Sequence, residues 1–468
     1  MSHAHVMEAR ILEDGSITIP AGKALQVKST IRRMDGSEIY PTEISDIHIG
    51  SSETGNGTLI FDNNSGDTKA RVDMYSKGFI DGSGVKNYQY IGTPFIEVNA
   101  LYNYYGSWIY YWGIKKNGNL GWVAVKNGGP MTAWTGYCIT QEAPTYYQMS
   151  GTLAATGTVD INVPADANMV VGNSWTAPID INALTTDDLE GLKASIYFFN
   201  TGVDKTGTAG PAGSRYAGST YVTIPVEAAR YVGEDDHINS LQGFFVKNTG
   251  GSAGTLHLDY ERHVRKTTRG SIIGDALHAP ARRTALSSDE PTVLKIKVSG
   301  ENYDDKLLLL EREDFTEGFD NGWDGDKWDG NGSALYIYTT DSEGTENSVS
   351  AIPELEGTII GFRAGEDDAY TLNFEYLNSD EPLYLYDVEN NTYTQIITGM
   401  TYRFFTTDNE KHARFIITRS NGQEVATGVG EVPSDQIQGT KAKKLLIGNK
   451  MFIMVNGMLY NATGKVVK

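Results

Sequence analysis

The chain has 468 residues, of which 40% are hydrophobic and 21% are charged, so it can bury a core and disorder is not expected. Its net charge of −20 argues against nucleic acid and anionic membrane surfaces as partners. Its single cysteine excludes an intramolecular disulfide, and no apolar run approaches the ~20 residues that a transmembrane helix needs. Gly and Tyr are frequent, at 52 and 27 residues, which favours short strands and turns and predicts an all-β fold.

Residues 1–65 contain short apolar alternations separated by turns. Isoleucines alternate at Ile17 and Ile19 and again at Ile47 and Ile49, and Asp-Gly and Gly-Asn-Gly turns lie between such runs. The segment resembles the rungs of secreted β-helices, so it fits the end of a β-helix-like stack. It fits an ordinary small β-sheet equally well, because so few rungs do not establish a repeat.

Residues 66–257 are rich in aromatic side chains and turn residues. We predict one or more antiparallel β domains here, because Tyr and Trp favour strands and Gly-containing turns separate the runs. Residues 258–292 are predicted to be a solvated linker, because basic side chains such as Arg262 and Arg265 precede the polar segment Ser287–Pro291.

Residues 293–420 contain short apolar runs with turns between them, the pattern of a β-sandwich domain. Residues 421–440 are polar and are predicted to be a tether. Residues 441–468 are predicted to form a short C-terminal β-hairpin, because Asn456 and Gly457 separate two apolar runs.

Several motifs occur in the same order as in secreted and cell-surface, adhesin-like β proteins of the Bacteroidota. They are Asn87–Pro94, Ser107–Trp112, Val170–Asp180, Leu241–Lys247, Arg414–Ile417 and, in the tail, Tyr460–Val467. The chain resembles these proteins over most of residues 66–420. The tail motif resembles the end of the C-terminal sorting domains read by the type IX secretion system, although this tail is shorter. The resemblance implies a secreted or outer-surface β protein.

An aromatic belt between Tyr102 and Trp134 is the first candidate binding surface. Tyr and Trp offer flat apolar faces with a polar group, which suits saccharides and protein partners. The same side chains can instead form the core of a sheet, because alternate aromatic residues in strands pack against one another. The candidate ligand-binding residues are Tyr105, Trp108, Tyr110, Trp112 and Trp122.

An acidic, glycine-rich segment offers candidate ligands for a calcium ion, the one cofactor that the sequence suggests. Calcium binds oxygen atoms that tight loops present. The EF-hand pattern fails, because Trp328 occupies the third ligand position, and the alternative is a solvated loop in which aspartates cap turns. The candidate calcium ligands are Asp320, Asp324, Asp326 and Asp329.

Two further patterns involve His257 and a helix. Strand alternation would place His257, Asp259 and Glu261 on one face, either as metal ligands or as a solvent-facing strand edge.

The segment Thr185–Ala194 is the best short-helix candidate, because a threonine can cap it.

The sequence predicts no enzyme. We expect a non-catalytic structural or adhesive module, extracellular or on the outer-membrane surface, that forms the C-terminal part of a longer bacterial surface protein. Residues Met1–His5 lack the apolar core of ~7–15 residues of a secretion signal, so the precursor would continue upstream. One alternative is a glycan-binding module that uses the aromatic belt, and another is an accessory region of a secreted hydrolase. The expected partner is an extracellular protein or a glycan, with no nucleic acid.

Overall fold

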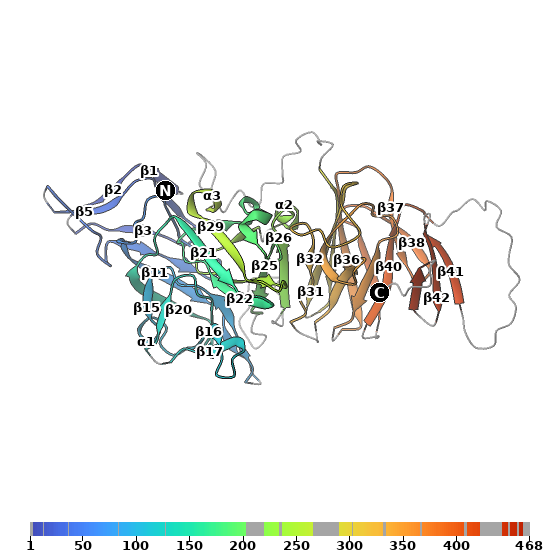
Figure 1. The fold of residues 1–468 in the computed structure, drawn as a ribbon, viewed down its shortest axis with the longest axis horizontal. Coiled ribbons are helices and arrows are strands. Elements are labelled where there is room, and N and C mark those ends of the chain that lie inside the picture. Colours follow the sequence, from blue (N-terminus) through green and yellow to red (C-terminus); the bar gives the residue numbers. More distant parts are fainter. Residues whose placement is uncertain are drawn as a thin grey trace, which may run out of the picture. The chain divides into compact units, whose positions relative to one another are not determined.

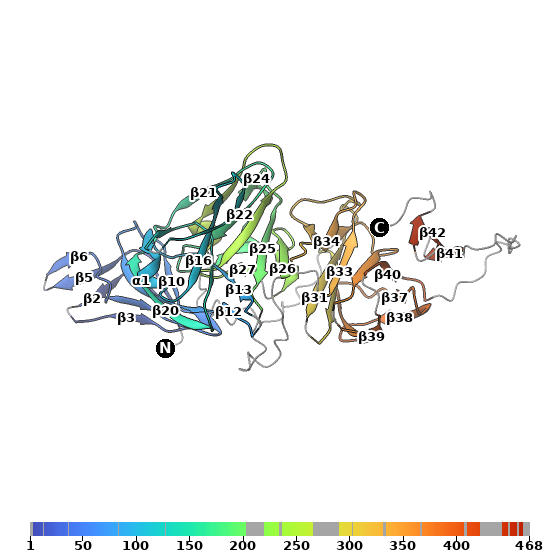
Figure 2. The ribbon, with the colours of Figure 1, turned by 90° about the horizontal axis from the view of Figure 1, so that it is seen from below.

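The computed structural model describes residues 3–202, 220–264, 290–421, 442–447, 450–455 and 458–461, apart from residues 13, 36, 83, 127, 234–235, 302, 331–333, 366 and 407–409. The chain divides into two compact units, Met1–Arg282 and Arg283–Lys468. Nearly all regular structure in the described residues consists of strands, which confirms the predicted all-β fold (Figures 1 and 2). No helix in these ranges is long and apolar enough to cross a membrane.

Unit 1 begins with three ladders of parallel strands. The first contains β1 (His3–Val6), β4 (Ala24–Val27) and β10 (Thr58–Phe61). The second pairs β2 (Ala9–Ile11) with β5 (Ile31–Asp35), and β6 (Glu38–Tyr40) adds antiparallel to β5. The third contains β3 (Ile17–Ile19), β7 (Ile47–Ile49) and β11 (Lys69–Ser76), and β20 (Thr145–Thr152) adds antiparallel to β11. A short hairpin, β8 (Ser51–Ser52) and β9 (Gly55–Asn56), follows β7.

Successive strands of the chain join the first, second and third ladder in turn, and the next strand joins the first ladder again. This is the arrangement of a β-helix. Branched apolar side chains fill the interior, and Val27, Ile31 and Ile47 have no exposed surface. Of the two interpretations of residues 1–65, the β-helix-like one therefore describes the structure.

The third strand of the first ladder connects this stack to the rest of unit 1. The Leu59 amide donates to the carbonyl oxygen of Thr176 at 3.0 Å, and the Phe61 amide donates to the hydroxyl of Tyr260 at 2.7 Å. The outer edge of β10 is thus hydrogen-bonded by segments more than 100 residues away, so the stack and the following sheets form one folded body.

Two four-stranded antiparallel sheets make up the centre of unit 1. One has the order β14 (Gln89–Ile91), β19 (Tyr137–Thr140), β16 (Trp108–Ile114) and β17 (Leu120–Ala124). The other has the order β22 (Ala167–Gly172), β28 (Gly243–Asn248), β25 (Ser195–Asn200) and β26 (Thr220–Pro225). They meet at Tyr90, whose ring stacks on Phe199 with centroids 4.3 Å apart and contacts Phe245 at 5.5 Å.

Smaller elements complete unit 1. A three-stranded sheet has the order β21 (Thr158–Val163), β29 (Gly254–Asp259) and β24 (Leu189–Glu190). The strand pairs are β12 (Phe79–Ile80) with β13 (Lys86–Asn87), β15 (Glu97–Asn99) with β18 (Pro130–Thr132), and β23 (Ile179–Asp180) with β27 (His237–Ile238). The helical turns are α1 (Ala100–Asn103), η1 (Ile181–Ala183), η2 (Thr186–Asp188), α2 (Ala229–Val232) and α3 (Tyr260–His263).

Unit 2 contains an 11-stranded sheet. Its order is β38 (Thr392–Ile396), β37 (Leu383–Asp387), β40 (Glu410–Thr418), β35 (Ile359–Arg363), β33 (Tyr336–Thr340), β34 (Glu346–Ile352), β31 (Asp304–Glu311), β30 (Thr292–Ser299), β36 (Ala369–Leu377) and β39 (Thr401–Phe405), and β32 (Gly325–Asp326) also pairs with β34. All these pairs are antiparallel except β31 with β34.

The large sheet curls on itself around an aromatic core. Phe362 of β35 contacts Tyr370 of β36 at 4.9 Å and Phe404 of β39 at 5.1 Å, although four strands separate β35 from β36 in the sheet order. Such contacts are only feasible when two parts of one sheet face each other, which is the sandwich-like packing predicted for this region.

The C-terminal segment forms three antiparallel strands, β41 (Ala442–Ile447), β42 (Lys450–Val455) and β43 (Met458–Asn461). The predicted turn at Asn456 and Gly457, the end of the tail motif and most of the predicted linker and tether lie outside the described residues. The finer domain boundaries stay predictions.

Two glycines of unit 1 mark a close contact between backbone segments. A Cβ added to Gly172 would lie 2.3 Å from the Cα of Gly92. We expect Gly172→Ala to lower the free energy of unfolding by about 1–3 kcal/mol, because the added carbon forces the two segments apart. Urea denaturation measures this difference. Gly55→Ala is the control, since no atom lies within 4 Å of a Cβ there, and equal stability of both variants would contradict the close contact.

Candidate functional site

Four of the five predicted aromatic ligands share one face of a sheet. Trp108, Tyr110 and Trp112 are alternate residues of β16, and Trp122 of β17 lies directly opposite Trp112. Side chains alternate between the faces of a strand, and directly paired residues lie on the same face. These four side chains therefore form one aromatic face.

The inner end of this face is packed against the neighbouring sheet. Trp112 contacts Trp122 at 5.1 Å and Phe245 at 5.3 Å, and Trp122 contacts Tyr90 at 5.0 Å. The indole nitrogen of Trp112 donates to the carbonyl oxygen of Asn168 at 2.7 Å. Trp112 and Trp122 thus join the two central sheets of unit 1.

The outer end of the face is open. Trp108 keeps 39% of its surface exposed, and the ammonium of Lys86 lies 4.2 Å from the centre of its ring. Tyr110 packs edge-on against Tyr88 with ring centroids 5.7 Å apart. This end of the face offers aromatic surface and a cation to a ligand.

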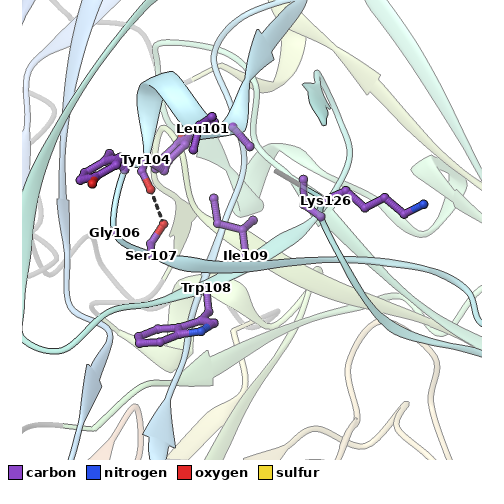
Figure 3. A pocket seen from close by; sticks show the side chains of 10 residues that line it. Leu101, Tyr104, Gly106, Ser107, Trp108, Ile109 and Lys126 are labelled. Carbon is purple, nitrogen blue, oxygen red and sulfur yellow. Dashed lines mark hydrogen bonds between the residues drawn. The ribbon is translucent and has the colours of Figure 1, made fainter. Parts of the chain in front are cut away.

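Tyr105 lies apart from the aromatic face, on the turn that follows α1, and 82% of its surface is exposed. The turn forms because Asn99 caps α1 by accepting hydrogen bonds from the Leu101 and Tyr102 amides at 3.0 and 3.4 Å. It borders a cavity of about 360 Å³ that Leu101, Tyr104, Ile109, Val125 and Lys126 also line (Figure 3). Trp108 also lines this cavity, and Figure 3 shows its ring and the Ile109 side chain pointing to opposite sides of β16.

The four predicted calcium ligands lie in β32 and the loops on either side of it, before β33. Asp320 and Asp329 contact other side chains or amides of unit 2. Asp320 accepts from the amide and hydroxyl of Thr316 at 2.7 and 2.9 Å. Asp329 pairs with Arg363 at 2.7 Å, and Asp326 belongs to β32. Within the described ranges, no group of three His, Cys, Asp or Glu side chains is placed to hold a metal ion. The calcium site stays a prediction.

Asp324 is the buried member of this acidic set. One of its carboxylate oxygens accepts from the Asp320 amide and the other from the Ala351 amide, both at 2.6 Å. Burial raises the pKa of Asp324 to about 7 and outweighs these two hydrogen bonds, which lower it. This aspartate holds the loop against β34.

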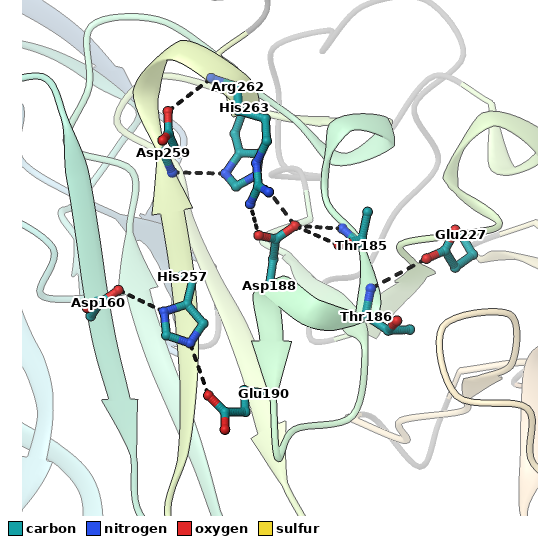
Figure 4. A network of polar contacts seen from close by, with 10 residues as sticks. All are labelled: Asp160, Thr185, Thr186, Asp188, Glu190, Glu227, His257, Asp259, Arg262 and His263. Atoms are coloured by element: carbon teal, nitrogen blue, oxygen red, sulfur yellow. Dashed lines mark hydrogen bonds and ion pairs between the residues drawn. The ribbon is translucent and has the colours of Figure 1, made fainter.

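His257 bridges two strands on the outer face of the sheet β21–β29–β24 (Figure 4). Its ring nitrogens lie 2.8 Å from Asp160 and 3.4 Å from Glu190. The hydrogen bond to Asp160 is the main cause that raises the pKa of His257. The prediction that His257, Asp259 and Glu261 share one strand face is wrong. The strand ends at Asp259, whose side chain caps α3, and Glu261 belongs to that helical turn.

A second polar cluster fixes the turn α3 (Figure 4). Buried Asp188 accepts from the amide and hydroxyl of Thr185, both at 2.9 Å, and pairs with Arg262. His263 is fully buried, and its Nδ1 accepts from the Asp259 amide at 3.0 Å. Burial lowers the pKa of His263 to about 4, so the ring is neutral. The helix expected over Thr185–Ala194 is wrong, because only η2 is helical and Leu189 enters a strand.

The raised pKa of Asp324 gives a pH dependence of stability. The folded state binds this proton more tightly than an unfolded chain, in which the pKa takes its ordinary value of 3.8. The contribution of Asp324 to the unfolding free energy is therefore most favourable below about pH 4, falls as the pH rises to about 7 and is constant above that.

We expect Asp324→Asn to remove this part of the pH dependence in chemical denaturation between about pH 4 and 8. Asp326→Asn, in the same segment, is the matched control and should retain the slope of the native chain. An unchanged slope in Asp324→Asn would contradict the buried, proton-binding carboxylate.

Comparison with known proteins gives one named relative and one family. The chain is 28% identical over 444 residues to the Minor fimbrium subunit Mfa5 of Porphyromonas gingivalis. The match covers 89% of this chain and 35% of the relative, so the chain spans about a third of the relative's length. No solved structure matches the chain. Residues 2–418 match the family described as "Domain of unknown function (DUF8693)", and the chain belongs to this family.

Proposed function

We propose that the chain is a non-catalytic structural and adhesive module of a bacterial surface protein, displayed outside the cell. The observation that carries this proposal is the similarity to a fimbrium subunit over 89% of the chain. The similarity extends through both compact units, because the family match runs from residue 2 to residue 418. Since the relative is much longer, we propose that the module works as part of a larger assembly.

The side chains best suited to catalysis have structural roles, which supports a non-catalytic module. Cys138 is buried, and burial raises the pKa of its thiol, so the reactive thiolate is disfavoured. His263 is neutral and enclosed, and Asp324 holds a loop through two backbone hydrogen bonds. His257 is accessible, but both its ring nitrogens face carboxylates on neighbouring strands.

Glycan binding at the open end of the aromatic face is a second candidate function. Trp108 combines an exposed ring with the neighbouring cation of Lys86, a pairing that suits a saccharide with acidic groups. Trp112 and Trp122 of the predicted belt support the fold, so we propose this role for the outer end of the aromatic face.

We also propose that the C-terminal strands act in export, as the resemblance of the tail to type IX sorting domains implies. The support is the separate antiparallel sheet β41–β42–β43, which follows the described part of the large sheet.

Surface display predicts that protease added to intact producing cells degrades the protein, while a cytoplasmic marker stays intact. Immunoblotting with an antibody against the purified chain measures the loss. Full protection in intact cells, with digestion after lysis, would contradict the proposal.

If the C-terminal tail directs export, we expect a shortened protein that ends at residue 440 to stay inside the cell. Cell fractionation compares it with the full-length protein, and circular dichroism of both purified proteins checks that the remainder folds. Normal surface display of the shortened protein would remove the sorting role and leave the adhesive role unaffected.

A further inference from the structure

The third parallel ladder carries an ordered set of polar side chains on its outward face. Buried and half-buried residues alternate strictly along β11, so every second side chain, from Lys69 to Tyr75, points outward. The neighbouring strands continue this face, because Ile47 and Ile49 of β7 are buried and leave the side chain between them outside.

The strand register places these outward residues in rows across the sheet. Thr18, His48, Arg71 and Ser150 form one row, since each is paired with the next. Asp73 is paired with Gln148, and Tyr75 with Tyr146, in two further rows. From Arg71 to Tyr75 the face extends ~13 Å along the strand.

A chain of hydrogen bonds fixes the middle of this face. Arg71 Nη2 donates to Nδ1 of His48 at 3.1 Å, which leaves the imidazole proton on Nε2. Nε2 then donates to one oxygen of Asp73 at 2.7 Å, and the amide of Gln148 donates to the other at 3.2 Å. Both oxygens of Asp73 are thus satisfied by neighbours on two different strands.

Several polar groups of this face remain available to a ligand. Arg71 is not among them, because it is half-buried, gives one of its donors to His48, and has its Nε buried without an acceptor among the described residues. Gln148 uses its amide nitrogen and leaves its carbonyl oxygen toward solvent, and Ser150 is exposed beside it. The face therefore presents fixed donors and acceptors side by side.

An aromatic pair borders the polar groups. Tyr146 keeps 57% of its surface exposed, and its ring centre lies 4.9 Å from that of Tyr75 with the planes tilted by 54°. Large exposed aromatic side chains beside ordered polar groups are typical of recognition surfaces. Here the exposed ring follows directly after the Asp73–Gln148 row.

We propose that this outward face of β7, β11 and β20 binds a neutral oligosaccharide. Hydroxyl groups of a sugar both donate and accept, which matches the amide of Gln148 and the hydroxyl of Ser150, both on exposed residues. The apolar side of a sugar ring can lie on Tyr146. The inference rests on the proposed adhesive function and names its ligand class and its surface.

Charge favours a neutral ligand over an acidic one. The carboxylate of Asp73 lies between His48 and the amide of Gln148, and Lys69 at the next outward position is paired with Glu43. Asp73 would repel an anion, Arg71 is half-buried against His48, and the chain as a whole is acidic.

The test uses the purified full-length chain and affinity gel electrophoresis with soluble dextran, mannan, laminarin and xylan, followed by calorimetric titration with the polysaccharide that retards it. We expect at least one of them to bind, with little dependence on salt. Tyr146→Ala should weaken this binding about tenfold, because the stacking surface is removed. Gln148→Ala should weaken it as well, and both residues are exposed, so both variants should fold.

Trp108→Ala is the matched control, since it removes an exposed aromatic side chain from the other candidate surface. It should bind like the native chain. Binding to none of the four polysaccharides, or equal binding by Tyr146→Ala and Gln148→Ala, overturns the proposal. Loss of binding in Trp108→Ala alone moves the site to the open end of the aromatic face.

Two further probes separate other ligand classes. Binding to heparin alone, abolished by salt, would show an anion site and overturn the choice of a neutral saccharide. Binding to immobilised fibronectin that depends on Tyr146, with no polysaccharide bound, would overturn it in favour of a protein partner. None of these results bears on surface display, which the protease experiment on intact cells tests separately.

Discussion

The buried apolar interior of the parallel stack is the constraint on which the rest of unit 1 depends. Ile19, Ile49 and Val72 come from three different passes of the chain, β3, β7 and β11, and all are buried. A shift of one residue in any strand would turn these side chains to solvent and bring polar ones inside, so burial fixes the register. The same register decides which side chains face outward, and therefore which chemistry the surface can offer.

The aromatic cluster around Tyr90 plays the corresponding role between the two central sheets. It takes side chains from β14, β16, β17, β25 and β28 and uses Trp112 and Trp122, which in isolation look like ligand-binding residues. This use of aromatic side chains leaves the function of the chain to its outer faces. A scaffold of short strands that displays side chains on such faces suits a surface module better than an enzyme that must enclose a substrate.

Much of the fold could be predicted from the sequence, because alternation and turns are local signals. The choice between a β-helix and a small sheet could not, since the partners of a parallel ladder, such as Ile17 and Ile47, lie far apart in the chain. The helix expected after Thr185 failed because Leu189 pairs with Leu256 of a distant strand, and this pairing overrides local propensity. Thr185, one of the threonines at the start of that segment, does precede η2, and its amide and hydroxyl donate to the Asp188 carboxylate.

The candidate sites were hard to predict for the same reason, because their side chains come from strands that lie far apart in the sequence. The five belt residues were chosen by residue type, and the local sequence could not show which of them the distant Phe245 covers. The polar face of the stack was missed, although the alternation of polar and apolar residues along Lys69–Ser76 signals an outward polar stripe. Its partners, His48 and Gln148, come from strands that only the folded chain brings together.

A crystal structure of the full-length chain soaked with an oligosaccharide of the bound polysaccharide tests the central claim most directly. The account predicts sugar density over Gln148 and Tyr146, with hydrogen bonds to Ser150 and no movement of the strands beneath. Density elsewhere on the molecule, or an outward face that rearranges to admit the sugar, would contradict the claim that the packed stack fixes the binding surface in advance.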